Sequence, residues 1–556
     1  MRAPTLLRYF FSSLQITLTA SGLMMSTAWA DQTLTFDGPV PEGGPDHFFV
    51  PFYVPAGTRE IEIRHDDRSD DNILDFGVHD PAGYRGWGGG TTEPAILGEQ
   101  AASRAYVPGP LPIGTWQVVV GKAKVVASPA VYHIEVVLRD RPTLAPQAER
   151  RPYRASAPLA RGRRYYAGDL HVHSRESTDA GPPLSQIVAF ARRRGLDFVE
   201  ISDHNTVTQL DYFAAAQPAD LLLVPGIEYT TYAGHANAIG ATGFVEHKLG
   251  QTVAGRPYTI ADAAATIAAQ GALLSINHPV LDLGLSCIGC AWRQPLSPSA
   301  IQAVEVGSGG LRQGAFLFTA AALRFWEALL AQGVHVAAVG GSDDHQGGTG
   351  TGRMDSPIGD PTTMVLADEL SVPALVDAIR HGRTVVKLQG PSDPMVELTA
   401  SQPGGTSADA TVGDTLAVRS TRLSARVTGI GADPTNQGMP YLRWIKNGES
   451  VAETAITSDP FVSTLPVLAH HPENGAPASP EDRYRVEIHV DGMARTITSP
   501  LYVRYDEGGP DVLAGEVPDN LSGCRASPRP PQPRSLVASL AALAAWALRR
   551  SLRRRA

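Results

Sequence analysis

Short apolar runs alternate with longer amphipathic runs between residues 165 and 388, and this alternation constrains the fold more than any other feature of the chain. The short runs are typical of buried strands and the longer ones of helices. Their alternation favours a parallel barrel or a doubly wound sheet, in which functional residues lie at the carboxyl ends of the strands. We expect strands at 165–171, 197–202, 221–227, 236–239, 272–277, 303–306, 335–340 and 384–388, and helices at 184–194, 259–269, 319–331 and 372–380.

The segments on either side of this α/β unit have an all-β pattern. Residues 31–145 and 391–508 consist of short alternating runs separated by turn residues, so each segment predicts a β-sandwich. A linker rich in proline and arginine occupies 146–163, and the central unit is expected over 164–390.

The first 30 residues have the features of a secretory signal peptide. Arg2 and Arg8 precede an apolar run, which ends in the A-x-A sequence of Ala28 to Ala30. We expect cleavage after Ala30, and a retained anchor helix is the alternative.

The last segment, 509–556, predicts a linker followed by a surface-sorting tail. Cys524 is followed by a Pro/Arg spacer, a short apolar run and a terminal arginine cluster. This order resembles the myxobacterial type of C-terminal sorting tail, and a plain membrane anchor is the alternative. We therefore expect an exported protein that is periplasmic, extracellular, or attached to the cell surface or membrane through this tail.

The net charge argues against one class of binding partner, and the cysteine spacing bears on the redox state of the chain. The formal net charge of −9 argues against nucleic-acid binding by bulk electrostatics. The chain has three cysteines, of which Cys287 and Cys290 form a C-x-x-C sequence. In an exported protein this spacing favours a local disulfide over a thiol redox pair.

Metal-binding residue types recur at the expected strand ends. The first strand ends in His171 and His173, whose side chains face the same way because they are two residues apart on a strand. The later strand ends supply His204, Glu228, His235, His278, Asp343 and His345. Taken singly, each of these residues is more simply explained by a structural role than by metal binding. Six of the chain's 16 histidines at equivalent positions, together with acids, favour a site for divalent cations.

The motifs around these residues resemble a known family. H-x-H, S-D-H-N, G-I-E, G-H-x-N, N-H-P and G-S-D-x-H occur in this order over about residues 164–390. They are similar to the motifs of the PHP (polymerase and histidinol phosphatase) metallohydrolases. The sequences E-Y-T-T-Y-A-G-H-A-N and H-G-R-T are similar to the secreted CehA/McbA-type subgroup, which includes a carbamate ester hydrolase. The resemblance implies a distorted (β/α)7 barrel that holds two or three divalent metal ions.

The resemblance also implies a ligand set for three metal positions. The first would be held by His171, His173, Glu228 and Asp343. Glu228 would bridge to the second, with His235 and His278. The third would be held by His204, His345 and Asp179, although Asp179 lies six residues after His173 where the family usually has five. Asp203 is expected to orient an imidazole.

These ligands suit zinc, manganese or ferrous iron, and a bridged pair of such ions would activate a shared water as hydroxide. Glu228 and Asp343 would hold the catalytic ions, so no serine or cysteine nucleophile is required. Arg175 and Arg353 are candidates for clamping a phosphate or carboxylate. Equally, each could pair with a nearby acid, Glu176 or Asp355.

Three functions follow from this site. The first is hydrolysis of phosphoesters, and the second is hydrolysis of a carboxylic or carbamate ester or amide at the same metals. Both would take a small-molecule substrate that is anionic or an ester. The third, of another class, is a surface-displayed binding protein with a structural metal site.

Overall fold

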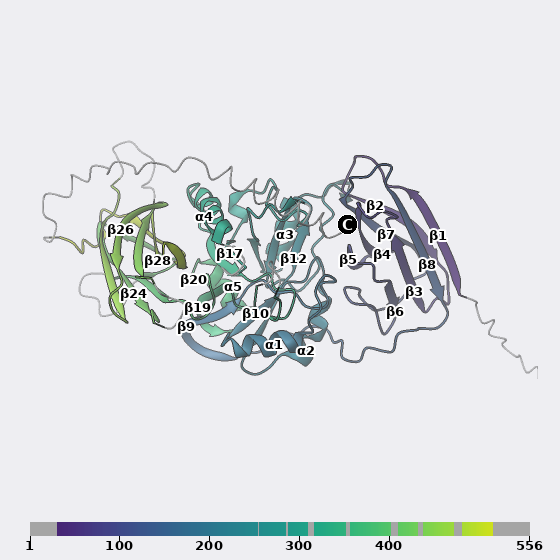
Figure 1. Cartoon of the computed structure of the whole chain (residues 1–556), viewed down its shortest axis with the longest axis horizontal. Coiled ribbons are helices and arrows are strands. Elements are labelled where there is room, and N and C mark those ends of the chain that lie inside the picture. Colours follow the sequence, from purple (N-terminus) through teal and green to yellow (C-terminus); the bar gives the residue numbers. More distant parts are fainter. Residues whose placement is uncertain are drawn as a thin grey trace, which may run out of the picture.

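The computed structural model describes residues 31–253, 255–284, 287–309, 316–351, 356–401, 410–431, 438–471 and 481–514. The expected signal peptide, Arg353 and most of the expected tail with Cys524 lie outside these ranges. The chain forms three parts in a row, with N-terminal strands at one end, helices in the centre and C-terminal strands at the other end (Figure 1). Within the described ranges, no helix combines the length and the apolar character needed to span a bilayer.

The N-terminal part consists of two four-stranded antiparallel sheets that pack face to face. Their strand orders are β1-β8-β3-β6 and β2-β7-β4-β5. The strands of the first sheet are β1 (Gln32–Pro39), β8 (Val131–Arg139), β3 (Glu60–Asp66) and β6 (Ala95–Gly98). Those of the second are β2 (His47–Val54), β7 (Gly114–Lys124), β4 (Ile73–Asp80) and β5 (Gly83–Gly89). Alternate side chains, including Ile61, Trp116 and Ile134, fill the core between them.

The central part contains two mixed groups of strands. In the first, β9 (Ala160–Asp169), β10 (Phe198–Ile201) and β11 (Leu222–Pro225) run parallel, and β19 (Thr362–Leu370) and β20 (Thr384–Lys387) continue from β9 in antiparallel pairs. The second group has the order β12-β13-β16-β17-β18. Its strands are β12 (Glu228–Thr231), β13 (Gly234–Ile239), β16 (Leu273–Ile276), β17 (Ala303–Ser308) and β18 (Ala337–Gly341).

Isolated bridges connect the two groups at the strand ends, between Val172 and Asp344 and between His204 and Glu228. The result is a mixed, sheet-rich unit, and the distorted (β/α)7 barrel stays a prediction. Strands β12 and β19 were not predicted. Only two residues separate β12 from β13, which is too short for a helical crossover, so these two strands form an antiparallel hairpin.

Four helices lie close to where the sequence predicts them. They are α1 (Leu184–Arg193), α3 (Ile260–Ala269), α4 (Phe316–Leu330) and α5 (Val372–Arg380). Thr259 and Asp262 form a capping box at the start of α3, which satisfies backbone N–H groups of its first turn. The shorter elements are η1 (Thr208–Tyr212), α2 (Phe213–Ala216), β14 (Thr252–Val253), β15 (Arg256–Pro257) and η3 (Pro298–Ala300).

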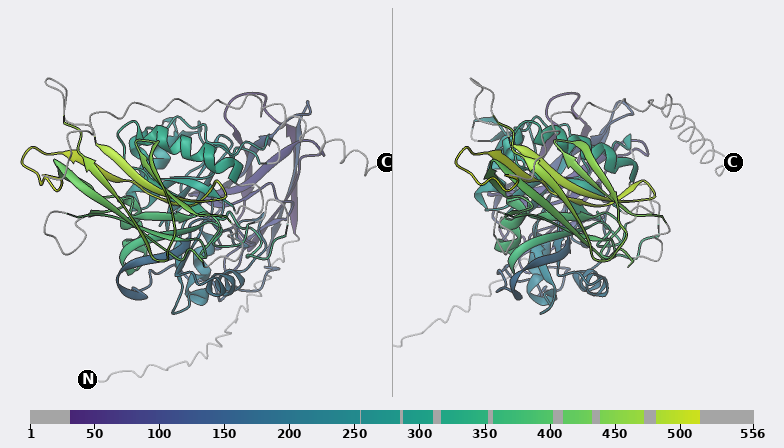
Figure 2. Two further views of the ribbon diagram at one scale, coloured as in Figure 1. Left: turned by 60° about the vertical axis from the view of Figure 1, so that its left-hand side comes forward. Right: turned by 90° about the vertical axis from the view of Figure 1, so that its left-hand side faces the viewer.

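The C-terminal part shares a sheet with the central part. Strand β20 pairs with β29 (Met493–Thr498), and the same sheet continues through β28 (Asp482–Val490), β25 (Tyr441–Lys446) and β26 (Glu449–Ala455), with β30 (Leu501–Tyr505) and β23 (Thr415–Val418) beside them. A second sheet covers it and contains β22 (Ala410–Thr411), β21 (Met395–Ser401), β24 (Ser420–Thr428) and β27 (Phe461–Leu468). Figure 2 shows these green and yellow strands against the central part, with the purple N-terminal strands on its far side.

Candidate metal centre

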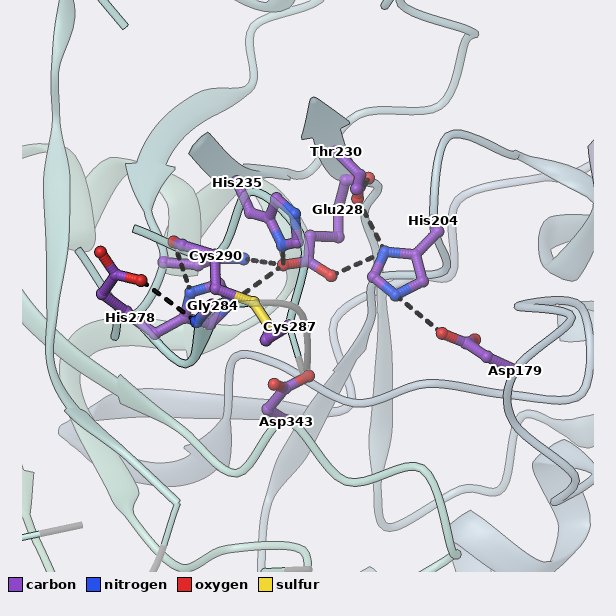
Figure 3. Close-up of a disulfide and its surroundings, with 12 residues drawn as sticks. Asp179, His204, Glu228, Thr230, His235, His278, Gly284, Cys287, Cys290 and Asp343 are labelled. Atoms are coloured by element: carbon purple, nitrogen blue, oxygen red, sulfur yellow. Dashed lines mark hydrogen bonds and ion pairs between the residues drawn. A yellow bond between two sulfur atoms is a disulfide. The ribbon is translucent and has the colours of Figure 1, made fainter. Parts of the chain in front are cut away.

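The predicted ligands come together at the strand ends of the central part. Figure 3 shows those at Asp179, His204, Glu228, His235, His278 and Asp343. One group contains His171, His173, Glu228 and Asp343, which each offer a ligand atom within 4.8 Å of the others. The Asp343 Oδ1 atom lies 3.2 Å from His171 Nε2 and 3.1 Å from His173 Nε2. The two histidines follow β9, Glu228 begins β12 and Asp343 follows β18, so three distant segments build this group.

Glu228 lies at the middle of the cluster, and its two carboxylate oxygens face different histidines. Its Oε2 atom is 3.4 Å from both His171 Nε2 and His173 Nε2. Its Oε1 atom is 3.2 Å from His235 Nδ1 and 3.3 Å from His278 Nε2. A carboxylate with imidazoles on both sides has the arrangement needed to bridge two cations.

A further group of imidazoles lies beside the first. His173, His204 and His345 offer ligand atoms within 4.8 Å of one another. The Asp179 Oδ2 atom is 3.1 Å from His204 Nε2 and 3.5 Å from His345 Nε2. The extra residue in the spacing therefore does not keep Asp179 away from these two histidines.

Several of the histidines are held by partners outside the predicted ligand set. Glu305 on β17 accepts a hydrogen bond from His171 Nδ1 at 2.9 Å, and another from the His278 backbone N–H at 2.7 Å. His278 Nδ1 donates to the carbonyl oxygen of Cys290 at 3.0 Å. Because these Nδ1 atoms are engaged, the Nε2 atoms of His171 and His278 face Glu228. A glutamate inside the apolar run of residues 303–306 was the available signal for Glu305.

The electrostatics of the cluster fit a divalent cation. Burial disfavours the charged form of His171, but the carboxylates of Asp343 and Glu228 outweigh it and hold the pKa of His171 well above its ordinary value. Burial also disfavours ionised Glu228, but neighbouring imidazoles, His171 first, hold the pKa of this carboxyl well below its ordinary value. The buried atoms His171 Nε2, Glu228 Oε2 and His235 Nε2 make no hydrogen bond within the described part of the chain. Cations between these atoms would give them partners.

Two other candidate residues, Asp203 and Arg175, have different surroundings. Asp203 accepts hydrogen bonds from the backbone N–H and the hydroxyl of Ser174, both at 2.6 Å, so it fixes the loop after the H-x-H pair instead of contacting an imidazole. Arg175 is half exposed and lies 3.5 Å from Glu176 Oε1, which is the alternative expected for it. Its role as a substrate clamp stays a prediction, as does that of Arg353.

A cavity of about 520 Å³ opens above the cluster, and the N-terminal sandwich forms one of its walls. Asp75, Trp87 and Thr91 line this wall. The Asp75 carboxylate accepts a hydrogen bond from Tyr232 of the central part at 2.6 Å. Burial raises the pKa of Asp75 to about 6. The sequence offered no signal for this wall, because these residues belong to a separate segment without a metal-binding motif.

Polar contacts hold the sandwich against the central part. Arg104 donates to the carbonyl oxygens of Thr178 and Ala180, each at 2.7 Å. The buried Glu176 carboxylate accepts from the Ala105 backbone N–H at 3.1 Å. These contacts involve residues just after the H-x-H pair, so the docked sandwich and the metal ligands share one loop.

The chain has distant likenesses among solved protein structures. No family model matches the chain, and no curated protein matches it. The chain is similar to a crystal structure from Bacteroides vulgatus ATCC 8482, described as a two-domain protein containing a predicted PHP-like metal-dependent phosphoesterase. The identity is 17%, the TM-score is 0.34, and the match covers 63% of this chain and 99% of that chain. A likeness this distant assigns neither a family nor an activity to the protein.

Proposed function

We propose that the protein is a metal-dependent hydrolase of phosphoesters, with a cluster of the kind found in PHP metallohydrolases. The observation that carries the proposal is the position of Glu228, whose two carboxylate oxygens each lie near two or more imidazoles. Two or three divalent ions (zinc, manganese or iron), when bound, would supply an activated water and neutralise charge that develops on the substrate.

Each group of residues has a defined task in this proposal. His171, His173 and Asp343 hold one position, and His235 and His278 hold the neighbouring one on the other side of Glu228. Asp179, His204 and His345 form the third. Glu305 and the Cys290 carbonyl keep two imidazoles in their orientations. The N-terminal wall narrows access to the cluster and limits the water around it.

A second substrate class has its own support in the cavity lining. Trp87 and Ile288 are apolar, and none of the described lining residues is a lysine or an arginine. Such walls suit the uncharged group of a carboxylic or carbamate ester. We therefore retain ester or carbamate hydrolysis as the alternative reaction at the same cluster.

Chromogenic substrates distinguish these reactions. The purified protein, with zinc or manganese added, is assayed with p-nitrophenyl phosphate, bis-p-nitrophenyl phosphate and p-nitrophenyl acetate. Faster turnover of either phosphoester supports the main proposal, and faster turnover of the acetate supports the alternative. Full metal content with no turnover of any of the three would instead favour a binding protein with a structural metal site.

Substitution of the cluster tests the assignment of its residues. We expect His171→Ala and Glu228→Ala each to abolish hydrolysis and to lower the metal content. His381→Ala is the matched control, because His381 is exposed and its described contacts are to Asp377. A Glu228→Ala variant with full activity and full metal content would refute the bridging assignment.

The place of action is a proposal of its own. We propose that the chain is exported and attached to the cell surface through its C-terminal tail, as the A-x-A sequence and the Cys524 tail suggest. Mass spectrometry of the native protein tests this. A mature chain that begins at Asp31 and has lost the terminal arginines is expected, and an intact chain would contradict it.

A further inference from the structure

A short loop closed by a disulfide lies beside the candidate metal cluster. Cys287 and Cys290 form this disulfide. Both cysteines and Ile288 between them line the same cavity as Glu228 and His278. Figure 3 shows the disulfide next to His278, Glu228 and Asp343. The proposed function assigns no role to these two sulfur atoms.

Contacts that do not involve the disulfide also hold Cys290 in place. Its carbonyl oxygen accepts the hydrogen bond from His278 Nδ1 at 3.0 Å. On the C-terminal side, the Trp292 backbone N–H donates to the Pro279 carbonyl oxygen at 2.9 Å, and that of Arg293 donates to Ala233 at 2.8 Å. Gly289 has a φ of 78° and packs so closely on the Thr231 carbonyl that a Cβ atom would lie 2.3 Å from its oxygen. The position of Cys290 is therefore fixed from both sides.

The Cys290 sulfur completes a set of three metal-ligating side chains. His235, His278 and Cys290 are all buried and offer ligand atoms within 4.8 Å of one another. His235 also has a buried Nε2 atom that makes no hydrogen bond within the described part of the chain. Two imidazoles with one thiolate form a ligand set that binds zinc-class cations strongly. A sulfur atom in a disulfide carries no negative charge and is a poor ligand.

We propose that Cys290 is a latent metal ligand that is withheld by the disulfide and released by reduction. A dithiol reductant supplies two electrons and two protons, the Cys287–Cys290 bond breaks, and the reductant becomes a disulfide. The Cys290 thiol then loses its proton to solvent as its sulfur ligates the cation held by His235 and His278, while Cys287 remains a thiol. The oxidised protein therefore keeps an open position beside Glu228, and the reduced protein closes it.

This inference rests on the proposed function in one respect only. If the open position serves hydrolysis, reduction must slow turnover as well as change the ligand set. The ligand set itself can be measured without any substrate.

Cobalt(II) provides the test, because cobalt bound by a thiolate has a strong near-ultraviolet charge-transfer absorption that imidazole and carboxylate ligands do not give. The full-length protein is loaded with cobalt and compared with two matched variants. Cys287→Ser leaves Cys290 as a permanent free thiol, and Cys290→Ser removes the ligand. We expect the wild-type protein to gain the absorption only after treatment with a dithiol. Cys287→Ser should show it without reductant, and Cys290→Ser should never show it. Cobalt-loaded Cys287→Ser without this absorption would overturn the proposal.

Alkylation of the reduced wild-type protein provides a second readout that needs no substitution. With cobalt bound, peptide mass spectrometry should find Cys287 alkylated and Cys290 protected, and removal of cobalt by a chelator should expose both. Equal alkylation of the two cysteines with cobalt bound would contradict the proposal. If no chromogenic ester is hydrolysed but the thiolate absorption follows the expected pattern, the proposed function fails and the latent ligand stands. If the dithiol leaves turnover unchanged and no thiolate absorption appears, the latent ligand fails and the proposed function stands.

Discussion

The two β-rich ends of the molecule are attached to the central part in different ways. In the described residues, both sheets of the N-terminal sandwich contain only its own strands. The sandwich docks through polar contacts, such as those of its Arg104 with Thr178 and of its Ala105 with Glu176 of the central part. The C-terminal part instead extends the central sheet, because β29 pairs with β20. Among the described residues that line the cavity, several belong to the N-terminal sandwich and none to the C-terminal part. The comparison suggests that the first module shapes the site and the second supports the fold.

The substitution with the largest expected effect disrupts the docking of the N-terminal sandwich on the central part. The buried Glu176 carboxylate accepts hydrogen bonds from Ala105 N and from Thr208 Oγ1, and lies 3.6 Å from the Arg150 guanidinium. Glu176→Ala leaves the Ala105 N–H without its acceptor and removes one of two carboxylates near Arg150, which keeps Asp211 at 3.2 Å. We expect a cost of about 1–3 kcal/mol for each buried group that loses its partner. We expect a lower midpoint in urea and a large loss of turnover.

The C-terminal counterpart is Glu327 of α4, which pairs with Arg485 of β28. Glu327→Ala should lower stability and leave the Michaelis constant unchanged, because neither residue lines the cavity. If Glu327→Ala lowered turnover as much as Glu176→Ala does, the two ends would not differ in the way proposed.

A smaller effect is expected on the pH dependence of stability, through the titration of Asp75 in the N-terminal sandwich. Burial raises its pKa from 3.8 to about 6, so the folded protein holds a proton that the unfolded chain releases between these values. The contribution of Asp75 to stability is therefore greatest below about pH 4 and falls as the pH rises through 6, by on the order of 3 kcal/mol. Asp75→Asn should remove this fall, and urea titrations at pH 4, 5, 6 and 7 would measure it.

Glu487 in the C-terminal part is expected to have the opposite dependence. Burial opposes ionisation of its carboxyl, but the hydrogen bond from His489 and the charge of Arg485 outweigh it and lower the pKa from 4.5 to about 2. The stability that Glu487 contributes is therefore complete above about pH 4.5 and is lost as the pH falls through 2. Glu487→Gln should reduce stability at pH 7 and not at pH 2. Equal losses at both pH values would contradict the assignment.

The substitutions with the smallest expected effect are at two tryptophans, one in each β-rich end of the molecule. Trp87 lines the cavity, whereas Trp444 fills the core of the C-terminal part. Trp87→Phe should raise the Michaelis constant roughly tenfold with the metal content unchanged, because it alters contacts with the substrate and not with the ions. Trp444→Phe should leave the Michaelis constant unchanged and lower stability by about 1–3 kcal/mol. A Michaelis constant that changes equally in both variants would remove the distinction between the two modules.

Local sequence patterns predict the metal ligands but not the residues that surround them. His171 and Asp343 follow β9 and β18, and Glu228 begins β12 shortly after β11, so a local pattern suffices to bring them to one edge. Glu305 and Asp75 act through contacts with residues more than a hundred positions away, which no local pattern encodes. Strand β19 was missed because its alternation is weak and Asp368 and Glu369 interrupt its apolar run. The β12–β13 hairpin was missed because its two halves are too short to stand out.

Metal analysis of the purified, dialysed protein tests the central claim most directly, because that claim is a cluster of ions shared through Glu228. Inductively coupled plasma mass spectrometry should find two or three divalent ions per chain in the wild-type protein, and at least one fewer in Glu228→Ala. His381→Ala should retain the wild-type content. A wild-type protein with less than one ion per chain, or a Glu228→Ala variant with unchanged content, would contradict the account.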